Sequence, residues 1–170
     1  VSQRKCTATL TEHTNDVWCI AVTAEAIASG GNDKTARIWP LDGGASLHTL
    51  QHPDAVFALA MARDVLVTGC FDRVVRTFSV SSGQPTRELR GHTSPVLSLA
   101  LSGSMVVSGG RDDKVKVWAM ADEASAECVA TLEHGGFVYG VVAGADFVAS
   151  QGNGITKMIV WRKGAAEVLG

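Results

Sequence analysis

The sequence lacks the features that would indicate a membrane or a nucleic acid as partner. Its longest uncharged apolar stretch, residues 137–145, is far shorter than the roughly 20 residues that a membrane-spanning helix needs. Arg and Lys are scattered rather than clustered, and the formal net charge is only −2. Neither an anionic lipid surface nor a nucleic acid would therefore be attracted electrostatically. We expect no membrane association and no direct binding to nucleic acid.

Cysteine is scarce, and no recognisable motif contains it. The residues Cys6, Cys19, Cys70 and Cys128 form no C-x-x-C pair. Single buried thiols explain them better than disulfides or zinc ligands, which points to a reducing compartment. The Gly pairs of the sequence are not followed by the Lys-Ser/Thr of a phosphate-binding loop. We expect no metal, no cofactor and an intracellular location, either cytoplasmic or nuclear.

A sustained 3.6-residue apolar period is also missing, and a longer period takes its place. Histidines recur at 13, 52, 92 and 134, at intervals of 39, 40 and 42 residues. Large aromatic residues recur at 39, 78, 118 and 161, at intervals of 39, 40 and 43 residues. Two independent anchors with one period indicate an array of one repeated unit, and a period of about 20–50 residues is typical of solenoids and propellers.

The third unit shows what each repeat contains. Residues 96–101 are almost without polarity on either face, as in a strand buried on both sides. Short turns separate them from strands expected at 105–108 and 115–118, and residues 126–132 predict a fourth strand. Four short antiparallel strands in about 40 residues make one propeller blade.

Three stretches of this unit resemble the WD-repeat family: residues 91–92 (Gly-His), 108–112 (Ser-Gly-Gly-Arg-Asp) and 115–118 (Val-Lys-Val-Trp). The same pattern begins at Leu10 in the first unit and ends at Trp39. The resemblance covers essentially the whole chain. It implies an all-β fold of four four-stranded antiparallel blades. The expected repeats are residues 6–45, 46–85, 86–125 and 126–164, with 165–170 starting a further outer strand, and the expected inner strands lie near 16–39, 55–78, 95–118 and 137–161.

In that family a His, a Ser or Thr, an Asp and a Trp form a hydrogen-bonded group inside each blade. Carried over by position, the groups are His13, Ser29, Asp33 and Trp39; His52, Thr68 and Asp72; His92, Ser108, Asp112 and Trp118; and His134, Ser150 and Trp161. The second group has Phe78 in place of Trp, so Thr68 loses an indole donor. The turn of the fourth group is one residue longer and lacks the Asp, which puts its network in doubt.

The resemblance also implies that the outer strand of each blade precedes the inner strands of the next. Segments of this kind end at Leu10, Leu50, Leu89, Leu132 and Leu169, which is one more than a closed four-bladed ring requires. The chain also begins with Val rather than Met. We expect an open arc from a larger ring of about seven blades.

The candidate catalytic residues are the His, Asp and Ser of the repeat, and their recurrence argues against catalysis, because a catalytic site is normally unique. We therefore predict no catalytic residue. The resemblance implies instead that certain repeat positions lie on one face of the propeller, around its channel. They are Trp18, Phe57, Leu97 and Tyr139 five residues after each His; Asn32, Phe71 and Arg111 before each turn Asp; and Asp16, Ala55, Pro95 and Phe137 three residues after each His.

Five of these eleven residues are aromatic, although aromatic residues make up only 6% of the chain. Aromatic and Arg side chains dominate binding hot spots. We predict a partner-binding set of Trp18, Phe57, Phe71, Leu97, Arg111, Phe137 and Tyr139. The expected function is a non-catalytic scaffold that docks proteins or peptides. Open alternatives are packing of Trp18 and Phe57 inside their strands, a substrate-recognition part of a ubiquitin ligase, and the propeller of a larger protein with an enzyme domain elsewhere.

Overall fold

The fold is a row of antiparallel sheets. The computed structural model describes residues 6–120, 127–154 and 158–162, which contain fifteen strands and no helix. The first sheet contains β1 (Val17–Val22), β2 (Ala26–Gly31), β3 (Thr35–Pro40) and β4 (His48–Gln51), and the second contains β5 (Val56–Ala62), β6 (Val65–Cys70), β7 (Val75–Ser79) and β8 (Pro85–Leu89). The third sheet contains β9 (Val96–Ser102), β10 (Met105–Gly110), β11 (Lys114–Ala119) and β12 (Glu127–Glu133). The fourth contains β13 (Val138–Ala143), β14 (Phe147–Gly152) and β15 (Ile159–Arg162). The predicted all-β architecture is confirmed.

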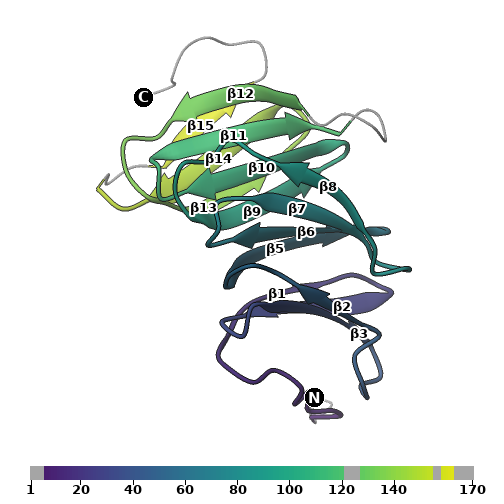
Figure 1. Cartoon of the computed structure of the whole chain (residues 1–170). Helices are drawn as coiled ribbons and strands as arrows, with labels where there is room; N and C mark the ends of the chain where they lie inside the picture. Colours follow the sequence, from purple (N-terminus) through teal and green to yellow (C-terminus); the bar gives the residue numbers. More distant parts are fainter. Residues whose placement is uncertain (1–5, 121–126, 155–157, 163–170) are drawn as a thin grey trace, which may run out of the picture.

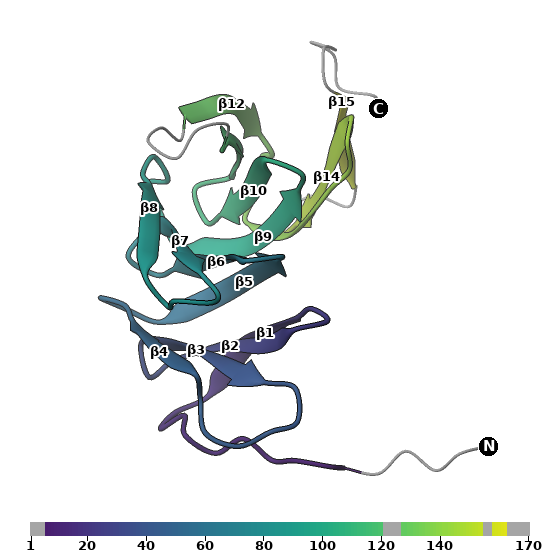
Figure 2. The ribbon, with the colours of Figure 1, turned by 90° about the vertical axis from the view of Figure 1, so that its right-hand side faces the viewer.

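The four sheets are propeller blades that follow one another along an open arc (Figures 1 and 2). Strands β1, β5, β9 and β13 come first in each blade and pack against one another in sequence order. The first and last blades lie apart at the two ends of the arc (Figure 2). Among the described residues each blade thus packs on the blades next to it in sequence, as in other repeat architectures.

Three of the five predicted outer strands are present, one is wrong and one lies outside the described residues. Leu50, Leu89 and Leu132 lie in β4, β8 and β12, as predicted, but the strand predicted to end at Leu10 is wrong. Residues 6–16 contain no strand, because a strand needs a partner and these residues pair with no strand of the described sheets. The segment ending at Leu169 lies outside the described residues, so the fourth sheet has three described strands.

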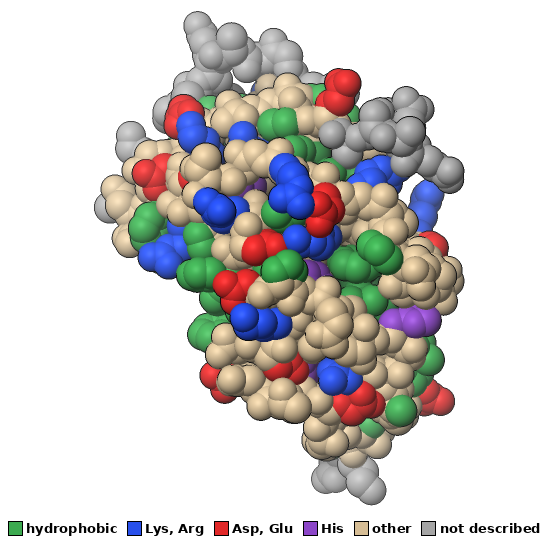
Figure 3. Space-filling view, in the orientation of Figure 1, with side chains coloured by type: hydrophobic (Ala, Val, Ile, Leu, Met, Phe, Trp, Pro, Cys, Tyr) green, Lys and Arg blue, Asp and Glu red, His purple; other side chains and the backbone are tan. Residues whose placement is uncertain are grey.

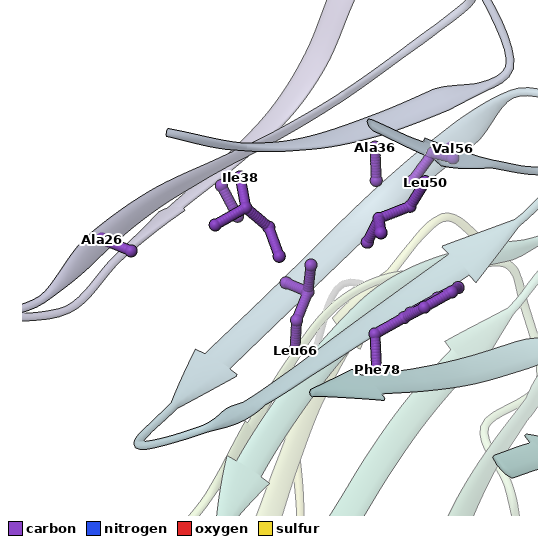
Figure 4. Packing of buried hydrophobic residues seen from close by; sticks show 8 residues of the cluster. Ala26, Ala36, Ile38, Leu50, Val56, Leu66 and Phe78 are labelled. Carbon is purple, nitrogen blue, oxygen red and sulfur yellow. The ribbon is translucent and has the colours of Figure 1, made fainter. Parts of the chain in front are cut away.

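The hydrophobic core is divided into three clusters, each between consecutive blades. In the first, Ile38 and Leu50 of the first blade meet Val56, Leu66 and Phe78 of the second (Figure 4). The second and third clusters repeat this arrangement between the following blades. Burial of apolar surface between sheets therefore holds the arc together.

The turns between the second and third strands of the first three blades share a conformation. Lys34, Arg73 and Asp113 follow the turn Asp and have positive φ values of 63°, 74° and 61°. Asp33 Oδ1 accepts a hydrogen bond from the amide of Thr35, and Asp72 Oδ1 accepts one from the amide of Val74. These local bonds stabilise the tight turn, which explains why Asp is favoured there.

Candidate functional site

A chain of hydrogen bonds runs through the first blade. The indole N–H of Trp39 donates to Ser29 Oγ at 2.8 Å, and Ser29 lies 2.7 Å from His13 Nε2. His13 Nδ1 lies 2.8 Å from Asp33 Oδ2. Because the carboxylate can only accept, Nδ1 carries the proton and Nε2 accepts from the Ser29 hydroxyl. Each of these four side chains therefore has a hydrogen-bond partner.

The third blade repeats this network. Trp118 Nε1 donates to Ser108 Oγ at 2.8 Å, and Ser108 lies 2.7 Å from His92 Nε2. His92 Nδ1 lies 2.9 Å from Asp112 Oδ2, which also accepts the amide of Thr93. Burial raises the pKa of Asp112, but the hydrogen bonds from His92 and Thr93 outweigh it, so the pKa is lowered.

The second blade departs from the prediction at Asp72. The carboxylate of Asp72 pairs with Arg76 Nη1 and Nη2, at 3.1 and 2.6 Å, and not with His52. His52 Nδ1 donates instead to the carbonyl of Leu50 at 3.0 Å, while Nε2 lies 2.9 Å from Thr68 Oγ1. The prediction that Asp72 belongs to the His network is therefore wrong.

The physical reason is a difference between neighbouring blades. Arg37, which occupies the position of Arg76 in the first blade, pairs with Glu12. In the second sequence repeat Gln51, on β4, stands at the position of Glu12 and offers no charge. The buried guanidinium of Arg76 takes Asp72 and Glu88 as partners instead.

The fourth blade has a partial network. His134 uses Nδ1, not Nε2, to reach Ser150 Oγ at 2.9 Å, and Trp161 Nε1 is 3.4 Å from the same hydroxyl. His134 Nε2 is buried without a hydrogen-bond partner among the described residues. Burial lowers the pKa of His134, which favours the neutral form of the ring. The missing Asp explains why this ring is left half-satisfied.

One backbone hydrogen bond recurs at the same end of every blade. The amide of Asn32 donates to the carbonyl of Asp16, that of Phe71 to Ala55, that of Arg111 to Pro95 and that of Asn153 to Phe137, at distances of 2.8 to 2.9 Å. It joins the loop before the first strand to the turn after the second. The predicted face residues of each blade are thus held next to one another.

Three aromatic side chains of the face touch across the first two blades. The ring centroids of Trp18 and Phe57 are 5.2 Å apart, and those of Phe57 and Phe71 are 5.8 Å apart. Both pairs are tilted, a geometry that aromatic rings favour. Trp18 is 53% exposed and Phe71 42%, whereas Phe57 between them is half-buried. We call Trp18, Phe57 and Phe71 the aromatic row.

A second group spans the third and fourth blades. The Arg111 guanidinium carbon lies 4.9 Å from the ring centroid of Phe137, within cation–π distance. Phe137 also makes an edge contact with Tyr139, with centroids 6.5 Å apart. Arg111 and Tyr139 are exposed, while Phe137 is half-buried. We call Arg111, Phe137 and Tyr139 the cationic group.

The remaining predicted positions are less prominent. Leu97 lies on β9, which belongs to the third blade, and is half-buried. Ala55 is buried and presents almost no surface, whereas Asp16 and Asn32 are exposed. Asn153 is exposed and was not predicted, because the longer fourth turn has no Asp from which the position before it could be counted. Counting three residues on from Ser150, as Arg111 follows Ser108, would have found it.

Comparison with known proteins agrees with these repeated features. The family model described as "WD domain, G-beta repeat" matches residues 4–40 and 83–119. The computationally designed protein Ika4 has a solved structure that superposes with a TM-score of 0.86 at 26% identity, over 95% of this chain and 100% of that one.

The chain belongs to the WD-repeat family.

Curated relatives of the chain are much longer. The human kinesin-like protein KIF21B is 27% identical over 110 residues, which are 62% of this chain and 7% of that protein. An F-box/WD-40 repeat-containing protein of Arabidopsis thaliana is 29% identical over 158 residues, 84% of this chain and 29% of that protein. The chain thus spans less than a third of the length of these relatives.

The rest of the WD-repeat surface is mixed in character. On the side seen in Figure 3, Lys and Arg side chains alternate with Asp and Glu, and no large area carries one sign. Within the described residues no group of three or more His, Cys, Asp or Glu side chains could hold a metal ion. The same residues include no helix that is long and apolar enough to cross a membrane. All four cysteines are free, with Cys70 buried and Cys6 and Cys128 exposed.

Proposed function

We propose that this WD-repeat chain is a non-catalytic scaffold that docks a protein or an extended peptide on the face formed by the aromatic row, Leu97 and the cationic group. WD repeats generally mediate interactions between proteins, which supports the general role. The observation that carries the choice of face is the contact of Trp18 with Phe57 and of Phe57 with Phe71 across two blades.

Exposure supports this choice. Trp18 and Tyr139 are 53% and 52% exposed, although large aromatic side chains gain free energy on burial. Rigid aromatic residues lose little conformational entropy on binding, and they commonly anchor interfaces. The aromatic row would receive apolar side chains of a partner.

Arg111 adds selectivity for charge. Stacking on Phe137 orients its guanidinium without using its N–H donors. A carboxylate or phosphate of the partner can then accept two parallel hydrogen bonds. The preferred partner segment is therefore apolar where it meets the aromatic row and acidic or phosphorylated where it meets Arg111.

The test starts with affinity capture of partners on the intact protein. Trp18→Ala and Tyr139→Ala should each weaken binding by about 2 kcal/mol or more, as expected for an anchor. Val129→Ala is the matched control, because Val129 is 55% exposed but lies on the outer strand β12. Loss of binding in Val129→Ala but not in the face variants would show that the face is wrongly assigned.

The same variants also decide between docking and packing for Trp18 and Phe57. Thermal unfolding of Trp18→Ala and Phe57→Ala should show folded proteins whose binding is weakened. If they lost binding only because they unfolded, both side chains would be packing residues.

A second candidate role is substrate recognition within a ubiquitin ligase. It is favoured by the similarity to the Arabidopsis F-box/WD-40 protein over 84% of this chain. In that case binding of a partner peptide should require its phosphorylation and should be lost in Arg111→Gln. The other alternative, a larger protein with an enzyme domain elsewhere, is favoured by the length of KIF21B.

A further inference from the structure

The turn that follows β14 brings an amide nitrogen next to a side-chain carbonyl. Asn153 and Gly154 are both exposed, and the N–H of Gly154 donates to Asn153 Oδ1 at 2.8 Å. Because Oδ1 is bonded to Cγ, the nitrogen of Gly154 is held close to the carbon of the side-chain amide. A potential nucleophile and an electrophilic carbon of the same chain are therefore already placed together, which favours reaction between them.

Gly154 leaves this pair of atoms accessible. Its φ is +82°, in the left-handed region that favours Gly. Among the described atoms, a Cβ added to Gly154 would come no closer than 3.8 Å to another group, the carbonyl oxygen of Gly135. Neither a side chain at residue 154 nor a close neighbour therefore keeps hydroxide or water away from the amide.

Asn15 provides an internal comparison. It is also exposed, and its Oδ1 accepts the N–H of Asp16 at the same distance of 2.8 Å. The two sites differ in the residue that follows the Asn. The side chain of Asp16 hinders closure of a five-membered ring, and its negative charge opposes loss of the amide proton. In the sequence, only Asn153 among the three Asn residues precedes a Gly.

We propose that Asn153 is a site of spontaneous deamidation in the folded protein, which converts it into Asp and isoAsp. Hydroxide removes the amide proton of Gly154, and the nitrogen then forms a bond to Cγ of Asn153. The side-chain nitrogen takes a proton from water and leaves as ammonia, so that a succinimide ring remains.

Water then opens the ring in one of two ways. Cleavage of the bond between the Gly154 nitrogen and Cγ gives Asp. Cleavage of the bond between this nitrogen and the backbone carbonyl carbon gives isoAsp. One water is consumed and one ammonia is released in total, and nothing is oxidised or reduced.

The conversion changes the face at the fourth blade. The N–H of Asn153 donates to the carbonyl of Phe137, and the Phe137 ring carries the guanidinium of Arg111. A Cβ added to Gly136 would lie 1.8 Å from the carbonyl oxygen of Asn153, so the two backbones pack directly on each other. In isoAsp this carbonyl becomes a free carboxylate, and the main chain gains a carbon. A negative charge thus enters the face beside the segment that bears Phe137.

Peptide mapping by mass spectrometry tests the proposal on the folded full chain after incubation in mildly alkaline buffer. The peptide that contains Asn153 should gain the mass difference between an amide and an acid, and an isoaspartyl methyltransferase should label part of the product. The rate should rise roughly tenfold per pH unit, because the deprotonated fraction of a group far below its pKa does so. Asn15 should keep its amide over the same period.

Two variants serve as controls. Asn153→Gln keeps a side-chain amide but would have to close a six-membered ring, so residue 153 should stay unconverted. Gly154→Ala should slow the conversion of Asn153, and circular dichroism checks that the positive φ of residue 154 has not prevented folding. The chain unfolded in urea is the reference for the role of the fold, and the folded chain should convert at a comparable rate.

Two results would overturn the proposal. One is conversion of Asn153 in urea but not in the folded chain, because the turn would then protect this residue. The other is equal conversion of Asn15 and Asn153, because the reaction would then not depend on the Gly that follows.

Discussion

Arg76 Nη2 lies 2.6 Å from Asp72 Oδ2, and this ion pair occupies the place where two other blades have a His–Asp pair. Only 10% of the Arg76 side chain and 17% of the Asp72 side chain is exposed. Burial is the main cause that lowers the pKa of His52; the charge of Arg76 lowers the pKa further, and that of Asp72 raises it.

Removal of the guanidinium should therefore change how His52 titrates. In Arg76→Met the unfavourable charge is gone and Asp72 remains, so the pKa of His52 should rise. An NMR titration of the His52 ring measures this directly. Arg73→Met, in the adjacent exposed turn, is the control, and equal shifts in the two variants would contradict the assignment of the effect to Arg76.

The stability of the second blade should depend on pH through His52. Burial lowers the pKa of His52 from 6.5 to about 4, so between these values the unfolded chain binds a proton that the folded chain does not. Stability is then unaffected by His52 above pH 6.5 and falls as the pH is lowered towards 4, by about 3 kcal/mol in all.

Urea denaturation at pH 7, 5.5 and 4.5 would reveal this loss, and it should be smaller in His52→Gln. An equal loss in both proteins would show that His52 is not its source.

The network of the third blade predicts a large cost for one carboxylate. Asp112→Ala leaves His92 Nδ1 buried without its acceptor, so unfolding free energy should fall by roughly 1–3 kcal/mol. Asp146→Ala, at an exposed position in a turn, should change it little. An unchanged denaturation midpoint for Asp112→Ala would contradict the network.

Phe78 leaves the buried hydroxyl of Thr68 without the indole donor that Trp39 and Trp118 supply in their blades. Phe78→Trp should therefore add one hydrogen bond and stabilise the protein by about 1 kcal/mol. The gain should disappear when Thr68→Val is present as well. A lower midpoint for Phe78→Trp would mean that the core around Leu66 cannot accommodate the larger ring.

The strands were predictable because each is short, apolar and bounded by turns at one period. The turn Asp residues were predictable as well, since they bond to amides two residues on. The prediction of a strand ending at Leu10 was wrong, because an apolar pattern alone does not show whether a segment has a neighbouring strand to pair with. Period and pattern therefore predict elements better than they predict pairing.

Side-chain partners were harder to predict. Asp72 matches the repeat in position, but its partner depends on a residue elsewhere in the sequence. Glu12 pairs with Arg37 in the first repeat, whereas the uncharged Gln51 leaves Arg76 to pair with Asp72 in the second. The contact between Trp18 and Phe57 joins two blades, so it depends on the offset between sheets, which no single repeat encodes. The sequence alone gives no reason for Gly at positions 30, 69 and 109, and only the packing of Val side chains on them reveals why Gly is required.

The central claim is that partners bind the face of the aromatic row and the cationic group. Hydrogen exchange of the intact protein, with and without a captured partner, tests it most directly. Protection should appear in residues 16–18, 55–57 and 71 and in residues 95–97, 111 and 137–139. Protection confined to the outer strands β4, β8 and β12 would contradict the account.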